Sequence, residues 1–364
     1  MNKDKLIKTI RNIIIFVILI ALTFSILLKD KDPREIWDLI LHAKIEYIIL
    51  GILSMCLYFL CEAINVKRIL SALGEKLSIF KAIKFSLIGF FFSSITPAAS
   101  GGQPMEIYYM HKEKHSVANA TLTLLLQLCF FQIVTISFGL VCAFIHRDLL
   151  HDGLTWLFLL GIGLNTSALI LFSICVFSKR LSKFFIKLSV KFLKFIKYKK
   201  VDQKEKSLYE GLEKYQASSV FIKQNKGILI KSLLTAYIQL IAYYSISYFS
   251  YKALGLEGHN WFDLITVQAL LYCTVSGIPS PGAVGINEWV YLQFFGPIFG
   301  ETLLASGMLL NRGMNFYLFV IISVIVTFIN SVAYKNIIVS DTDDEIKEGV
   351  KENNKEIIKN NKNK

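Results

Sequence analysis

Two short polar segments lie inside apolar runs of this sequence, and they are similar to one another. The first covers residues 94–106 and reads SITPAASGGQPME, and the second covers residues 276–288 and reads SGIPSPGAVGINE. Aligning them matches three pairs of residues: Pro97 with Pro281, Gly101 with Gly285, and Gln103 with Asn287. Because proline lacks an N–H and glycine has a loose backbone, both segments should interrupt helices.

Such breaks favour a transport site, since unwound backbone at membrane depth persists only where protein or water satisfies its polar groups. The residues expected to interrupt the helices are Pro97, Pro104, Pro279, Pro281 and Gly282. The residues expected to bind a substrate come from both breaks and from the last apolar run: Ser100, Gly101, Gly102, Gln103, Glu106, Tyr109, Gly285, Asn287, Glu288, Arg312 and Asn315. These side chains are costly to embed in lipid, so each needs a structural or functional reason.

The second break suits an anion. A helix starting after Gly285 would present free N–H groups and a positive dipole end, which favour a group such as a lipid phosphate. Arg312 could add a permanent positive charge for the same phosphate. Alternatively, Glu288 and Arg312 pair with each other and lower the cost of embedding both. The sequence leaves both interpretations open.

Other chemistry is disfavoured. The run from Ser100 to Gly102 lacks the lysine spacing of a nucleotide-binding loop. His111 and His115 flank Glu113 but do not form a zinc-binding HExxH pattern. The six cysteines all lie in apolar runs without a CxxC spacing, which is typical of membrane-embedded apolar residues. We therefore expect no catalytic residue, no metal and no cofactor.

The surrounding elements are apolar helices. The chain has 364 residues, of which 54% are hydrophobic and only 18% are charged. Runs long enough to cross about 30 Å of hydrocarbon recur along it, whereas a β-barrel would show short alternating strands. The fold class is therefore an all-α polytopic membrane protein.

Complete spans are predicted at about 9–28, 46–66, 117–145, 154–177, 227–250 and 303–334. The first is interpreted as an uncleaved span, because no small-x-small cleavage site follows it. Runs 80–110 and 263–298 contain the two breaks. The basic loops, taken as cytoplasmic, require each of these runs to enter the membrane and return on the same side. The sequence thus predicts two re-entrant hairpins of opposite orientation, with both termini cytoplasmic in the plasma membrane.

Four parts follow: a membrane half at 1–177, a basic connection at 178–226, a second membrane half at 227–335 and a disordered charged tail at 336–364. Within the connection, basic residues recur every three or four positions, as on an amphipathic helix lying on an anionic leaflet. This lipid-surface stripe consists of Arg180, Lys183, Lys187, Lys191 and Lys194. A solvated linker helix is the alternative.

The net charge of +13 fits attraction to anionic lipid head groups, and it also fits the ordinary excess of positive charge in cytoplasmic loops. Nucleic-acid binding is not expected, since no soluble domain presents a basic face. The expected partners are membrane phospholipids with anionic head groups, and the oligomeric state is left open.

The two breaks resemble the signatures of a known family. Residues Thr96 to Pro104 are similar to its T-P-x-x-S-G-G-[EQ]-P motif, and residues Pro281 to Glu288 are similar to its P-G-x-x-G-x-x-E motif. Arg312 fits the arginine that follows. The family is the transmembrane region of lysylphosphatidylglycerol synthases, and the resemblance covers about residues 10–335. The second motif departs slightly, with Val284-Gly285 where the family usually has two glycines.

The resemblance implies a lipid flippase. In two-part members, this membrane region moves aminoacylated phosphatidylglycerol between leaflets, while a separate cytosolic domain makes the lipid from aminoacyl-tRNA. Because the sequence ends in a short charged tail, we expect no synthase activity from it. We expect it to move a phosphatidylglycerol-derived lipid, such as lysyl-phosphatidylglycerol. The alternatives are a lysyltransferase or polyprenyl-linked lipid-modifying enzyme, and a membrane module that recruits a separate lipid synthase as its partner.

Overall fold

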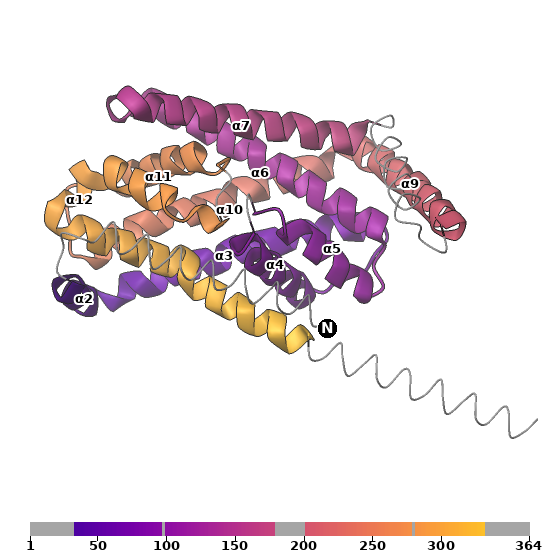
Figure 1. Ribbon diagram of the computed structural model, residues 1–364, viewed down its shortest axis with the longest axis horizontal. Coiled ribbons are helices and arrows are strands. Elements are labelled where there is room, and N and C mark those ends of the chain that lie inside the picture. Colours follow the sequence, from indigo (N-terminus) through magenta and orange to yellow (C-terminus); the bar gives the residue numbers. More distant parts are fainter. Residues whose placement is uncertain (1–32, 97–98, 179–200, 279–280, 332–364) are drawn as a thin grey trace, which may run out of the picture.

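The computed structural model describes residues 33–96, 99–178, 201–278 and 281–331, and every regular element in these ranges is a helix (Figure 1). Five of these helices are long and apolar enough to cross a membrane. They are α3 (Ile45–Ala72), α6 (Val117–Ile145), α7 (Asp152–Phe177), α10 (Lys226–Ala253) and the long helical segment Ile286–Ser331. The chain is therefore an all-α polytopic membrane protein, as the sequence predicts.

The helix bounds follow the predicted spans closely. The span predicted at 117–145 coincides with α6, and those predicted at 46–66, 154–177 and 227–250 lie within α3, α7 and α10. The predicted span 9–28, the lipid-surface stripe and the tail all lie outside the described residues. Two further helices, α2 (Pro33–Leu41) and α9 (Val201–Gln224), flank the membrane helices.

The first broken run forms a pair of short helices. α4 (Ile79–Ser94) has 16 residues and α5 (Gly102–Lys112) has 11. At 1.5 Å per residue these helices are about 24 Å and 17 Å long, so neither reaches across about 30 Å of hydrocarbon. Such lengths suit a hairpin that enters and returns.

The second broken run has the same plan. α11 (Trp261–Val275) leads to a one-turn helix η3 (Pro281–Ala283), and α12 (Ile286–Arg312) then begins. α12 is interrupted at Gly300, where φ is 68° and ψ is 162°. This break lies between the hairpin predicted at 263–298 and the span predicted at 303–334. Beyond α12, a π-helical turn η4 (Gly313–Tyr317) leads into helix that continues to residue 331.

The two hairpins occupy opposite ends of the bundle (Figure 1). α4 and α5 lie toward the end that holds α9, and α11 with the start of α12 lies toward the other end. Their turns meet in an apolar cluster that includes Phe91 and Ile95 from the first hairpin and Val284 from the second, packed around Phe316. We call this group the tip cluster. The main core lies between α6, α7, α10, α11 and α12. The passage of each hairpin through the membrane stays a prediction.

Candidate functional site

The two breaks share a backbone conformation as well as a sequence pattern. Ala99 has φ of 52° and Ala283 has φ of 53°, and the sequence alignment places these two residues at the same position. The returning helices also begin at matching residues, with Gly101 preceding α5 and Gly285 preceding α12. A left-handed alanine costs about 1–2 kcal/mol, so two matching cases are not accidental turns. The sequence repeat is therefore a conformational repeat.

Thr96 closes the turn of the first break. Its hydroxyl donates to the carbonyl of Phe92 at 2.6 Å and accepts from the N–H of Gly101 at 2.9 Å. Gly102 then brings α5 close to α4: a Cβ there would meet the carbonyl oxygen of Gly89 at 2.9 Å and would also collide with the hydroxyl of Ser93. The paired glycines in the motif are thus needed for close helix packing.

Glu106 is the buried acid of the first hairpin. Its side chain is packed against Gly89 of α4, and the residue is only 4% exposed. Its Oε2 has no hydrogen-bond partner within the described residues. Glu62 on α3 lies within electrostatic range of it. Embedding a carboxyl group with an unpaired oxygen is costly, so Glu106 needs a structural or functional reason.

The other first-hairpin residues that were expected to bind substrate have different surroundings. Ser100 and Pro104 are exposed, and Gln103 is half-buried. Tyr109 is buried in an apolar cluster with residues of α3, α4 and α6. Pro97 lies outside the described residues, as does Pro279 of the second break.

The second break is organised by a buried ion pair. Arg312 Nε donates to Glu288 Oε1 at 2.7 Å, and Arg312 Nη2 donates to the carbonyl of Gly282 at 3.1 Å. The other oxygen of Glu288 accepts the N–H of Gly285 at 2.7 Å. The arginine side chain is 4% exposed and that of the glutamate is 0% exposed. The pair therefore ties the last span to the turn of the second hairpin.

Aromatic rings enclose the arginine from the other side. Its guanidinium carbon lies 4.3 Å from the ring centre of Phe316 and 5.7 Å from that of Tyr317. The Phe316 ring also presses on Gly282, where φ is 59° and a Cβ would collide with the ring. Since Phe316 belongs to the tip cluster, the same ring contacts the arginine and the meeting point of the two hairpins.

Asn315 belongs to a separate chain of amides. Its Nδ2 donates to Asn311 Oδ1 at 3.0 Å, and Asn311 Nδ2 donates to Gln268 Oε1 of α11 at 3.1 Å. The sequence predicts that Arg312 and Asn315 face roughly the same way, yet they contact different partners. Asn287 is buried next to Glu288.

The expected site residues therefore form two groups. Those of the second break and the last span are joined directly, through Gly282, Gly285, Glu288 and Arg312. No hydrogen bond or ion pair in the described ranges connects them with Ser100, Gln103 or Glu106. Instead, the two groups approach through the apolar tip cluster.

The predicted site residues do not include Glu62, Gln268 or Phe316. Glu62 and Gln268 had a visible signal, because each is a polar residue inside an apolar run. Phe316 had none, since one phenylalanine among many does not stand out. Within the described ranges, no three His, Cys, Asp or Glu side chains are grouped so that they could hold a metal ion.

The chain is similar to known membrane proteins. The family described as "Lysylphosphatidylglycerol synthase TM region" matches residues 12–323. A "UPF0104 membrane protein" of Archaeoglobus fulgidus is 25% identical over 287 residues, which cover 74% of this chain and 81% of that protein. Both breaks and Arg312 fall inside the family match.

Proposed function

This chain belongs to the lysylphosphatidylglycerol synthase transmembrane-region family, and on that premise we propose that it is a flippase for an anionic phospholipid. The substrate is a lipid built on phosphatidylglycerol, such as lysyl-phosphatidylglycerol. Its head group crosses between the two hairpins while its acyl chains stay in the bilayer. The protein acts in the plasma membrane with both termini in the cytoplasm.

The observation that supports this proposal best is the buried Arg312–Glu288 pair at the second break. An arginine binds a phosphate with the same planar set of donors that it offers a carboxylate. A lipid phosphate can therefore replace Glu288 as the partner of Arg312 without leaving the guanidinium uncompensated. Glu288 and the lipid phosphate then compete for Arg312, so the contact between Arg312 and Glu288 can open and form again.

The tip cluster is the barrier in this proposal. It fills the meeting point of the hairpins with apolar side chains. Phe316 is one of them, and its ring also contacts Arg312. Binding of a phosphate by Arg312 draws the guanidinium away from Phe316 and Gly282. The Phe316 ring, which packs where the two hairpins meet, thereby loses its contact with the guanidinium.

Glu106 is the candidate carboxyl group for proton coupling. It is buried, its Oε2 has no hydrogen-bond partner in the described chain, and Glu62 lies near it. A proton that is taken up on one side and released on the other would supply the energy, and the sequence has no nucleotide-binding motif. Glu106→Gln is expected to remove the dependence of transport on a proton gradient.

The decisive test is lipid translocation in proteoliposomes, with labelled phosphatidylglycerol and lysyl-phosphatidylglycerol compared side by side. Wild-type protein should move at least one of them. Arg312→Ala should abolish the movement while the protein stays inserted and folded. Movement of neither lipid by folded wild type, or unchanged movement by the variant, would contradict the proposal.

The same preparation tests the alternatives. An enzyme of the lysyltransferase type would produce a new aminoacyl lipid when expressed in a host that lacks one. A recruiting module would co-purify with a lipid synthase and move no lipid. Either result, with no translocation, would replace the flippase assignment.

A further inference from the structure

A polar cavity of about 720 Å³ lies at the end of the bundle that holds α9, away from both breaks. Three segments line it: the loop between α3 and α4, the loop between α5 and α6, and α9. Its volume falls within the range of about 300–1,000 Å³ that is typical of small-ligand sites. None of the residues discussed for transport lines this cavity.

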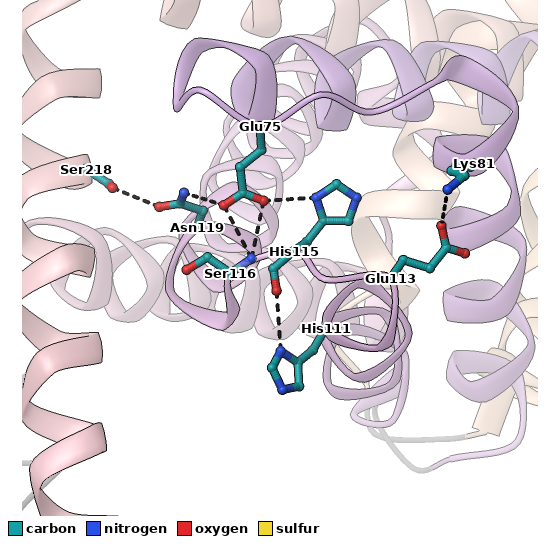
Figure 2. A network of polar contacts seen from close by, with 8 residues as sticks. All are labelled: Glu75, Lys81, His111, Glu113, His115, Ser116, Asn119 and Ser218. Atoms are coloured by element: carbon teal, nitrogen blue, oxygen red, sulfur yellow. Dashed lines mark hydrogen bonds and ion pairs between the residues drawn. The ribbon is translucent and has the colours of Figure 1, made fainter. Parts of the chain in front are cut away.

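Both acids of the cavity have close polar partners (Figure 2). Glu75 Oε2 accepts from His115 Nδ1 at 2.9 Å, and Glu75 Oε1 accepts from Asn119 Nδ2 at 2.5 Å. The N–H of Ser116 points at both carboxylate oxygens, at 3.3 Å each. Glu75 therefore holds the junction between α5 and α6 together through hydrogen bonds.

Glu113 is committed in the same way. It forms an ion pair with Lys81 at 2.8 Å and a second one with Lys84, both from α4. Figure 2 shows Glu113 directed toward Lys81 and away from the Glu75 group. Two lysines of α4 therefore flank the Glu113 carboxylate.

Three further lysines face the cavity without compensation. Lys76, Lys114 and Lys214 come one from each lining segment, and all three are exposed. None makes an ion pair with another described residue. His111 adds a ring whose Nδ1 lies 3.4 Å from the carbonyl oxygen of His115. Lysines therefore outnumber acids in the lining of the cavity, and they come from separate parts of the chain.

Exposed apolar side chains around the cavity favour a location at a membrane surface. Val117 lines the cavity, is 46% exposed and begins the apolar helix α6. Nearby, Phe80 at the start of α4 is 81% exposed and Tyr108 of α5 is 47% exposed. An amphipathic ligand can hold its charged group among the lysines while its apolar part follows the exposed side of α6.

We propose that this cavity binds a phosphate group, held between Lys76, Lys114 and Lys214, at the surface of the membrane. The phosphate is carried either by a phospholipid head group or by a soluble phosphate compound, and the chemistry at the lysines is the same. This inference goes beyond the transport proposal, because binding here involves neither Arg312 nor the two breaks.

The test is binding to the full-length protein in a neutral detergent. The probes are short-chain phosphatidylglycerol, inorganic phosphate, glycerol phosphate and, as the zwitterionic comparison, short-chain phosphatidylcholine. Binding is measured by calorimetry and by the shift in melting temperature. We expect saturable binding of phosphatidylglycerol, about fivefold weaker for each lysine removed.

Two kinds of variant make the result specific. Lys76→Gln, Lys114→Gln and Lys214→Gln together remove the site, while Lys67→Gln, Lys226→Gln and Lys231→Gln remove the same charge from exposed positions outside the cavity. Gly211→Trp fills the cavity without changing any charge, because a Cβ at Gly211 would meet nothing within 4 Å.

The outcomes separate clearly. In an Arg312→Ala background, which removes phosphate binding at the second break, binding lost in the cavity triple variant and in Gly211→Trp, but kept in the control triple variant, supports the proposal. Preference for phosphatidylglycerol over the soluble phosphates identifies a lipid as the source, and equal binding identifies a soluble compound. No saturable binding of any phosphate by folded wild type, or equal losses in both triple variants, overturns it. Because Arg312→Ala should bind normally here, failure of this proposal is distinguishable from failure of the transport proposal.

Discussion

At the scale of single residues, the central question is what the pair of Glu288 and Arg312 does. As a structural pair, it would neutralise two buried charges and fix the last span to the second hairpin. As a substrate site, it would open when a phosphate replaces Glu288. Removing one partner of a buried pair costs about 3–5 kcal/mol, so a single substitution damages the protein under both interpretations.

A double substitution separates the two roles. Arg312→Ala alone should lower the melting temperature, because Glu288 is left buried without a partner. Glu288→Gln combined with Arg312→Gln leaves no buried charge and should recover most of the lost stability. The double variant should still fail to transport, as measured in proteoliposomes. Recovery of both stability and transport would show that the arginine has a structural role only.

The matched alanines at the two breaks store local strain. Ala99 and Ala283 both have left-handed backbone, which glycine adopts without a steric penalty. Replacing Ala283 by glycine should therefore be neutral or stabilise the protein by up to about 1 kcal/mol.

Thermal unfolding tests this against a helical alanine. Ala217→Gly, at an exposed position in α9, should cost about 0.5–1 kcal/mol, as glycine does in helices. An equal cost at positions 217 and 283 would mean that the turn at Ala283 is not strained.

At the scale of elements, the first hairpin depends on close approach of α4 and α5. The Cβ of an alanine at Gly102 would meet the backbone of Gly89, which cannot move aside as a flexible side chain can. Gly102→Ala should therefore cost about 1–3 kcal/mol or more, since it overpacks the contact.

Gly163→Ala is the matched control for this change. It lies in α7, where a Cβ would meet nothing within 4 Å, so the same substitution should leave stability unchanged or slightly raised. Measurement of melting temperature in detergent compares the two variants. An unchanged melting temperature with alanine at position 102 would show that α4 and α5 can move apart without loss of stability.

His146 joins the end of α6 to α11. Its Nε2 donates to the hydroxyl of Thr266 at 2.7 Å, since that hydroxyl already donates to backbone carbonyls of its own helix. Burial lowers the pKa of His146, against the opposing effect of the nearby Asp148 and Asp263. The folded protein thus prefers the neutral ring.

The pH dependence of stability follows from the lowered pKa of His146. Above the ordinary histidine pKa of about 6.5, the ring is neutral in both folded and unfolded chains, and its contribution is constant. Below it, the unfolded chain takes up the proton more readily, so stability falls as the pH is lowered. Between about pH 7.5 and pH 5, the wild type should lose more melting temperature than His146→Gln does. Identical slopes would contradict this role.

At the scale of the whole molecule, the hairpins predict which loops share a side of the membrane. Lys76, Lys114 and Lys214 all line one cavity, so we expect them to lie on one side of the membrane. If both hairpins are re-entrant, Gly153, Gly258 and Thr302 lie on the other side. Single cysteines at positions 76, 114 and 214 should react with an impermeant maleimide only after the cells are opened. Single cysteines at positions 153, 258 and 302 should react in intact cells.

This labelling pattern also tests the threading directly. A first hairpin that crossed the membrane would place residue 76 and residue 114 on opposite sides. Opposite accessibility of cysteines at these two positions would therefore refute the re-entrant arrangement. The six native cysteines are replaced first, because Cys56 is exposed.

Much of the architecture could be predicted because lipid imposes simple rules on sequence. The apolar run at 117–145 predicted the bounds of α6, and the Pro and Gly pattern predicted the positions of both breaks. The sequence also predicted that a helix begins after Gly285, where α12 starts. The side-chain contacts could not be predicted in this way, because the partner of Arg312 and the ring of Phe316 depend on three-dimensional packing.

The cavity beside α9 escaped prediction for a different reason. Its lysines come from positions 76, 114 and 214, which are far apart in the sequence and look like ordinary loop charges. Only the packing of α9 against α6 brings them together. The sequence predicts that the basic loops share the cytoplasmic side, but it does not locate a site among them.

The π-helical turn Gly313–Tyr317 follows directly after Arg312 and has a consequence for the last span. In it, the N–H of Leu318 donates to the carbonyl of Gly313, so this turn contains one more residue than an α-helical turn. One residue corresponds to about 100° of rotation and 1.5 Å of rise. The stretch beyond Tyr317 is therefore out of phase with the stretch before Arg312. If this turn became α-helical, the part of the span beyond Tyr317 would rotate by about 100° about its axis. A different row of its side chains would then face α4.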